Sequence, residues 1–157
     1  QEMIGKLYSD ANNPFVGFCV NPASNVDDER EIEEGLAFIL NTFSKYPFAV
    51  YQIPQITQSQ VTPQSLSSLC QRYENLIILK DTSETDDIVK SGLDFHGLFL
   101  IKGGDKNMID HLMPKNDGFL SYDGLMFSTA NNYPVLLKRM MDDLCNNDGR
   151  DIQNALR

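Results

Sequence analysis

A lysine directly follows a run of apolar residues in the stretch NLIILKDTSET, which spans residues 75 to 85. Leu76 to Leu79 form the run, and Lys80 ends it. A short continuous apolar run is typical of a strand in a parallel sheet, and the carboxyl end of such a strand faces the active site in α/β folds. Burial penalises the charged form of an amine, and a neutral amine can attack a carbonyl carbon. Position alone equally allows a lysine that reaches solvent or pairs with Asp81.

A tyrosine lies near the end of the preceding apolar run, FAVYQI, residues 48 to 53. If the two runs are neighbouring parallel strands, Tyr51 and Lys80 lie at the same edge of the sheet. A phenol at that place could relay a proton to and from an intermediate formed on the amine. A lone tyrosine is more commonly an aromatic cap on the core, and this alternative stays open.

Signatures of several other enzyme classes do not occur in the sequence. It contains no GxSxG, GxxxxGK[ST], HExxH or GxGxxG motif, which removes the usual hydrolase and nucleotide-binding interpretations. His96 and His111 are isolated among polar residues. We predict both as surface histidines without a catalytic role.

Charge and cysteine content narrow the class of protein. The 157 residues include 22 Asp and Glu against 13 Lys and Arg, a formal net charge of -9, which disfavours nucleic acid and anionic membrane surfaces as partners. The three cysteines are far apart and form no CxxC pair, which argues against a disulfide framework and a zinc cage. No apolar run reaches 18 residues, and no basic leader precedes one. We expect a cytoplasmic protein without a metal or a membrane segment.

Five apolar runs alternate with segments of helical pattern, which predicts an α/β fold of successive βα units. The strongest helical pattern covers 27–46, with acidic residues in its first turn and an apolar stripe along one face. A second helix is predicted from Pro63, with Thr62 as its cap. The apolar runs are 15–20, 48–53, 76–80, 97–101 and 124–128, and weaker helical patterns cover 85–92, 105–113 and 133–145.

Two architectures fit this alternation: an open doubly wound sheet, or part of a (β/α)8 barrel. A whole barrel normally takes about 250 residues, so this chain is too short to close one alone.

Four segments in order carry a family resemblance: FAVYQIPQIT, LIILKDTS, IKGGDK and DGLMFSTANNYP. Together they resemble the dihydrodipicolinate synthase/N-acetylneuraminate lyase family, class I aldolases built on a (β/α)8 TIM barrel. The resemblance implies one partial barrel domain over 1–157, holding the C-terminal five βα units, with the C-terminal helical extension only begun at 146–157. It also implies that strands one to three and the loop that binds the 2-oxo acid carboxylate belong to a longer protein.

The resemblance assigns roles to individual residues. Lys80 falls on the lysine that forms a Schiff base with pyruvate or another 2-oxo acid, and Tyr51 falls on the proton-shuttling tyrosine. Gly103, Asp105 and Ser128 fall on positions that contact the substrate in the lyase branch. No cofactor is implied, because the protonated imine is the electron sink. The implied partners are small-molecule 2-oxo acid and aldehyde substrates, and the implied assembly is a homotetramer.

Several positions depart from the family pattern. Gln52 stands at the place of an asparagine, Gln58 at the place of a glycine, and Lys106 at the place of a glutamate of the lyase branch. Ile56 occupies the position of the arginine that binds the substrate carboxylate in the synthase branch, and an apolar side chain cannot hold a carboxylate. Thr57 matches the family's Thr/Ser, where we expect a structural hydroxyl.

The favoured function is therefore a lyase-type class I aldolase that adds pyruvate to an aldehyde or cleaves a 4-hydroxy-2-oxo acid. Three alternatives remain. One is dihydrodipicolinate synthase, and another is a binding or regulatory paralogue without turnover, suggested by Gln52 and Gln58. The third is an unrelated flavodoxin-like open sheet, in which Lys80 would lie on a loop with no tyrosine nearby.

Overall fold

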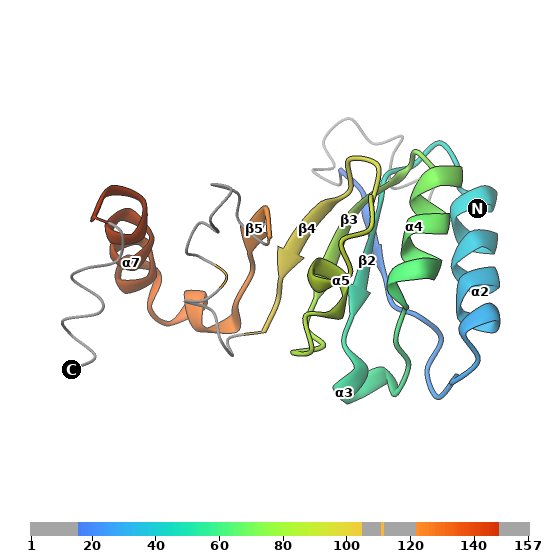
Figure 1. Cartoon of the computed structure of the whole chain (residues 1–157), viewed down its shortest axis with the longest axis horizontal. Helices are drawn as coiled ribbons and strands as arrows, with labels where there is room; N and C mark the ends of the chain where they lie inside the picture. The colour runs from blue at the N-terminus through green and yellow to red at the C-terminus, as the bar shows by residue number, and fades with distance from the viewer. Residues whose placement is uncertain (1–15, 105–110, 112–121, 148–157) are drawn as a thin grey trace.

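The computed structural model describes residues 16–104, 111 and 122–147, and its core is a five-stranded parallel sheet (Figure 1). The strand order in space is the order along the chain, and every neighbouring pair is parallel. The strands are β1 (Phe18–Val20), β2 (Phe48–Gln52), β3 (Leu76–Asp81), β4 (Phe99–Lys102) and β5 (Gly124–Leu125). The helices are α2 (Glu29–Thr42), α3 (Pro54–Thr57), α4 (Pro63–Arg72), α5 (Asp87–Lys90), the 3-10 helix η1 (Ser128–Asn131) and α7 (Pro134–Asn147).

Helices α2 and α4 each begin at a side-chain cap, of which the sequence analysis predicted Thr62. The Asp28 side chain accepts hydrogen bonds from the backbone N–H groups of Arg30 and Glu31 at the start of α2. Thr62 Oγ1 accepts from the backbone N–H of Ser65 at 3.1 Å at the start of α4, where Pro63 occupies the first turn. Both helices lie side by side along the sheet (Figure 1).

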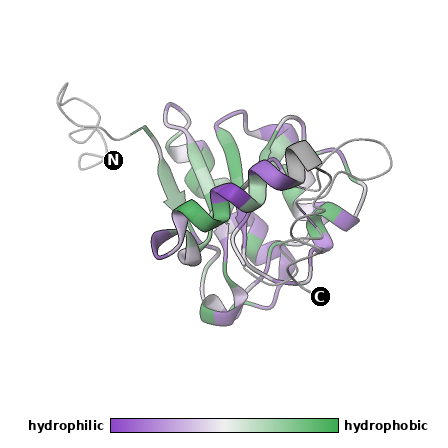
Figure 2. Ribbon diagram, turned by 90° about the vertical axis from the view of Figure 1, so that its left-hand side faces the viewer, coloured by the Kyte–Doolittle hydropathy of each residue, from purple (hydrophilic) through white to green (hydrophobic). Residues whose placement is uncertain are grey.

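The core lies between the sheet and these two helices. Burial of each large aliphatic side chain in it stabilises the fold by about 1.5–3 kcal/mol. Figure 2 shows the hydropathy of these elements: the strands are green and therefore hydrophobic. Helix α7, which lies nearest the viewer, alternates green and purple. The helices contribute Ile32, Leu36, Leu40, Leu66 and Leu69, and the strands contribute Phe48, Val50, Leu76 and Leu79.

Alternating burial along β2 and β3 distinguishes the two faces of the sheet. In β2, Val50 and Gln52 are buried while Tyr51 is half-buried; in β3, Leu79 and Asp81 are buried while Lys80 is half-buried. Successive side chains of a strand point to opposite faces. We call the face with the buried residues the helix face, and the face that carries Tyr51 and Lys80 the inner face.

The predicted βα alternation is confirmed, and the chain-order arrangement of the strands excludes an open sheet whose order reverses. The last two strands are shorter or shifted relative to the apolar runs, because 97–101 begins with a turn and 124–128 continues into η1. The predicted helix at 105–113, apart from residue 111, and the segment 148–157 lie outside the described residues. Within the described residues, no helix is long and apolar enough to cross a membrane.

Candidate active site

Tyr51 and Lys80 are direct neighbours on the inner face. They are Cα partners in the β2–β3 ladder, and the Lys80 Nζ lies 4.1 Å from the centroid of the Tyr51 ring. The negative face of a phenol ring attracts an ammonium at this distance and holds it in place. Asp81 points to the helix face, so the interpretation of Lys80 as an ion-pair partner of Asp81 is wrong. The structure therefore puts an amine and a phenol together at the carboxyl ends of two adjacent strands.

Gly103 completes this arrangement from the end of β4. Its backbone N–H donates to the Asp81 carbonyl at 2.7 Å, which sets Gly103 beside the Lys80 side chain. A Cβ atom at this position would lie 2.9 Å from Lys80 Cε and would also meet Thr82 Oγ1. A side chain at this position would require Lys80 or Thr82 to shift.

Thr82 is a site residue that the sequence analysis missed. It follows Lys80 by two positions and lies with the Lys80 side chain against Gly103. Its Oγ1 is buried and has no hydrogen-bond partner among the described residues. A buried hydroxyl is normally paired, so Thr82 offers an unused donor and acceptor beside the amine. The period of two along a strand was the signal that could have identified it.

The structure brings together three of the five predicted site residues. Ser128 is the first residue of η1, is exposed, and follows β5, which β4 separates from Lys80 and its strand. Asp105 lies outside the described residues, as does Lys106. The roles of Gly103, Asp105 and Ser128 towards substrate therefore remain predictions.

Gln52 and Gln58, which differ from the family pattern, lie away from the Lys80 amine. Gln52 is on the helix face and 0% exposed; its Oε1 accepts from the Val61 N–H at 2.9 Å and its Nε2 lies 3.4 Å from Asp81 Oδ1. Gln58 has φ 53°, a left-handed conformation that glycine adopts without a steric cost. Gln52 therefore has a structural role on the helix face, and Gln58 lies at the end of α3. Neither residue alters the surroundings of Tyr51 and Lys80 on the inner face.

The short helix α3 borders the site and carries Ile56, whose side chain is 73% exposed. Gln55 Nε2 donates to the Thr82 carbonyl at 2.7 Å, which ties α3 to the loop after β3. Thr57 is buried and its hydroxyl lies 3.1 Å from the Ser59 carbonyl, in agreement with the predicted structural role.

A buried polar cluster lies behind the site. Asp86 accepts from Lys102 Nζ at 2.8 Å and from the Tyr122 hydroxyl at 3.0 Å, and His111 Nε2 lies 3.0 Å from its second oxygen. His111 is only 8% exposed, so the prediction of a surface histidine is wrong there, whereas His96 is exposed as predicted. Because the sequence around His111 is polar, its burial depends on partners distant in the chain. Lys102, already paired, does not compete with Lys80 as a nucleophile.

Two pKa values in the cluster are shifted. Burial alone would raise the pKa of Asp86, but the hydrogen bonds from Lys102 and Tyr122, together with the charges of Lys102 and His111, outweigh it and hold this pKa below its ordinary value. Burial, together with the Asp81 and Asp86 carboxylates, raises the pKa of Tyr122 above its ordinary value. Both effects keep a carboxylate and a neutral phenol in contact.

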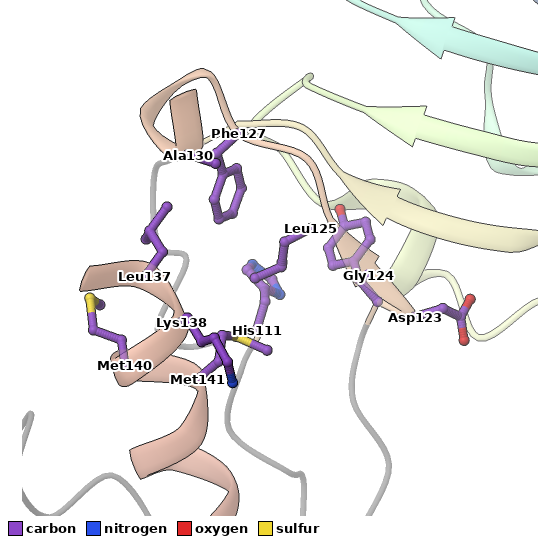
Figure 3. Close-up of a pocket in the computed structure, with 11 residues that line it drawn as sticks. His111, Asp123, Gly124, Leu125, Phe127, Ala130, Leu137, Lys138, Met140 and Met141 are labelled. Carbon is purple, nitrogen blue, oxygen red and sulfur yellow. The ribbon is translucent and has the colours of Figure 1, made fainter. Parts of the chain in front are cut away.

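A pocket of about 270 Å³ lies between β5, η1 and α7 (Figure 3). Leu125, Phe127, Leu137 and Met141 give it an apolar lining, and His111 borders it. It is lined by neither Tyr51, Lys80 nor Gly103. Within the described residues, no group of three or more His, Cys, Asp or Glu side chains could hold a metal ion.

Comparison with known proteins gives consistent likenesses. The sequence profile of the dihydrodipicolinate synthetase family matches residues 18–156. Among solved structures, a dihydrodipicolinate synthase from Aquifex aeolicus superposes with a TM-score of 0.72 at 19% identity, over 91% of this chain and 48% of that one. The Thermotoga maritima synthase gives 0.72 at 13% identity, over 98% and 52%. The chloride-inhibited Acinetobacter baumannii synthase, complexed with pyruvate, gives 0.72 at 17% identity, over 98% and 51%.

These likenesses identify the sheet and its helices as part of a (β/α)8 barrel, as the sequence analysis predicted. The chain spans about half the length of the structures that it matches. No curated protein sequence matches the chain.

Proposed function

This chain belongs to the dihydrodipicolinate synthetase family, a family of lyase-type enzymes, and we propose from this premise that its complete barrel is a class I aldolase acting through Lys80. The observation that carries the proposal is the Tyr51–Lys80 pair at the carboxyl ends of β2 and β3. The comparison structures support the fold, and this geometry together with family membership supports the reaction.

The proposed reaction begins with the neutral Lys80 amine attacking the carbonyl carbon of a 2-oxo acid. A new C–N bond forms, the carbonyl oxygen takes up a proton, and the carbinolamine loses water to give a protonated imine. The imine then draws electrons from the neighbouring carbon, which loses a proton to become an enamine that adds to an aldehyde. The reverse sequence cleaves a 4-hydroxy-2-oxo acid. Tyr51 carries the protons at these steps, which requires its hydroxyl within about 2.6–3.2 Å of its partner in the bound state.

We propose pyruvate, or another 2-oxo acid, as the imine-forming substrate. The Acinetobacter baumannii synthase is described as complexed with pyruvate, and that ligand is carried to this chain only by the proposal. Gly103, Asp105 and Ser128 are proposed to contact the aldehyde part. Ile56 provides no charge for a carboxylate, which favours the lyase-type reaction over the synthase reaction.

The active protein requires the rest of the barrel. Five of the eight strands of such a barrel are described in this chain, and a loop for the 2-oxo acid carboxylate is expected from the remaining strands. We further propose a cytoplasmic location and a homotetramer, which cell fractionation and light scattering would check.

The test uses the protein with its complete barrel. It is incubated with pyruvate, reduced with borohydride, and digested for peptide mass spectrometry. We expect the reduced adduct on Lys80. It should be absent in Lys80→Ala and in Lys80→Arg, because a guanidinium stays protonated and forms no imine. An adduct on Lys102 or Lys106 would contradict the assignment, and no adduct at all would favour the binding paralogue.

A further inference from the structure

The buried polar cluster behind the site contains an ion pair between Asp86 and Lys102. Asp86 is 3% exposed and Lys102 is 1% exposed, and their charged atoms are 2.8 Å apart. Asp86 lies in the loop between β3 and α5, whereas Lys102 is the last residue of β4. The pair therefore joins two segments that flank the site, on the helix face of the sheet.

A buried ion pair adds little net stability to a fold. Taking both charges out of water cancels much of their attraction, so an apolar pair of similar volume is often equally stable. Breaking such a pair, in contrast, leaves one buried charge without compensation. The pair at Asp86 and Lys102 is therefore better explained by the geometry that it enforces than by the stability that it adds.

The Asp86 end of the pair holds a strained loop. Glu84 has φ 63° and Asp86 has φ 60°, and both are left-handed conformations disfavoured for residues with a Cβ. The loop starts directly after Lys80 and Asp81. The Tyr122 hydroxyl lies 3.1 Å from Asp81 Oδ2 and 3.0 Å from Asp86 Oδ1, so it ties the two ends of the loop together.

Lys102 is linked to the Lys80 side chain through the backbone of β4 and Gly103. Lys102 is the Cα partner of Asp81, and the next residue, Gly103, packs against Lys80 Cε and Thr82. A displacement of Lys102 would therefore move Gly103 against the Lys80 side chain. Both ends of the ion pair thus lead to the same amine, one through the loop and one through β4.

We infer that the Asp86–Lys102 ion pair is a positioning device for Lys80, which fixes the end of β4 and the loop after β3 around the amine. The inference rests on the proposed function for its catalytic consequence. Misplacing a reacting group by about 1 Å can cost roughly 10²-fold in rate. Loss of the pair should therefore slow imine formation while the fold is retained.

The test replaces both charges together in the protein with its complete barrel. The double variant Asp86→Asn, Lys102→Met removes both charges and keeps an amide that can bond the Tyr122 hydroxyl and His111 Nε2, so its urea midpoint should stay near that of the wild type. The rate of pyruvate trapping on Lys80 should fall roughly 10- to 10²-fold. The matched control is Lys138→Met with Asp142→Asn, which removes the exposed ion pair of α7 and should leave the rate unchanged.

A second measurement separates this inference from the proposed function. Reductive methylation with formaldehyde and cyanoborohydride, resolved by peptide mass spectrometry, reports the reactivity of the Lys80 amine without any turnover. We expect its rate to change several-fold in the double variant and not in the control. A changed methylation rate in a protein that traps no pyruvate would support the positioning and reject the proposed function. Wild-type methylation and trapping rates in a folded double variant would overturn the inference.

Discussion

Gly103, the residue that directly follows β4, leaves room for Lys80: a Cβ on Gly103 would lie 2.9 Å from Lys80 Cε and 3.2 Å from Lys80 Cγ. Real Cβ contacts are not found at such a separation from carbon, so either the lysine or the strand would have to move.

Gly103→Ala is therefore expected to displace the amine and to lower the rate of pyruvate trapping on Lys80 roughly 10²-fold. Gly104→Ala is the matched control, because its Cβ would come no closer than 3.4 Å to a Glu84 side-chain atom. Borohydride trapping followed over time measures both. Equal rates in the two variants would show that the contact does not constrain Lys80.

Tyr51→Phe is expected to separate imine formation from turnover. The ring remains beside Lys80, so the borohydride adduct should still form on this lysine. Without the hydroxyl, turnover should fall by roughly 10²- to 10⁴-fold, the usual effect of losing a proton-transfer group. Steady-state kinetics with trapping on the same samples checks this, and full turnover in the variant would remove Tyr51 from the mechanism.

Because Ile56 is apolar, we expect the protein to be a poor catalyst of the condensation of aspartate semialdehyde with pyruvate. An exposed aliphatic side chain on α3 cannot bind the carboxylate of that aldehyde, so its condensation with pyruvate should be inefficient. A coupled assay of the wild-type protein measures this directly. Ile56→Arg should leave pyruvate trapping unchanged and improve the reaction with the semialdehyde, and a high wild-type rate would contradict the assignment to a lyase.

Gln58→Gly is expected to stabilise the protein by about 1 kcal/mol, because Gln58 has φ 53° and glycine adopts this conformation without strain. The free energy of unfolding in urea measures the effect. Gln60→Gly is a suitable control, since Gln60 is not among the described residues with positive φ and the change there should only add flexibility. A loss of stability in Gln58→Gly would mean that its side chain, and not its backbone, matters.

Asp86 predicts a specific loss of stability in acid. Its pKa is held below the ordinary value in the folded state, so its charge stabilises the fold above about pH 4 and this contribution disappears as the pH falls through the lower folded value. In Asp86→Asn the free energy of unfolding should be lower at pH 7 and should change less between about pH 4 and pH 2. Asp27→Asn, at an exposed position, is the control. Urea unfolding at several pH values checks both slopes.

The sequence was sufficient for the presence of the five strands, for helices α2, α4 and α7, and for the central pair of the site. Tyr51 and Lys80 each lie at the end of an apolar run, and the two runs form adjacent parallel strands. The two side chains therefore come to the same edge of the sheet. The helix cap at Thr62 is a local signal and was predicted, whereas Asp28, which caps α2, was placed inside the predicted helix 27–46.

The polar cluster could not be predicted, because its members are far apart in the chain. His111 contacts Asp86 across 25 positions and Tyr122 contacts Asp81 across 41, and no local pattern encodes such pairs. In the sequence, Lys102 follows an apolar run just as Lys80 does. Only the alternation of faces, counted from the correct strand register, separates an amine on the inner face from one paired on the helix face.

The identity of strand order and chain order has a consequence for how the protein folds. Each strand pairs only with the strands that precede and follow it in sequence, so each pairing closes a loop of one βα unit. The entropy lost in closing a loop grows with its length, so these short closures come early and at low cost. The five described strands can therefore pair one unit at a time from any neighbouring pair, whereas pairing the first and last strands of a barrel closes the longest loop.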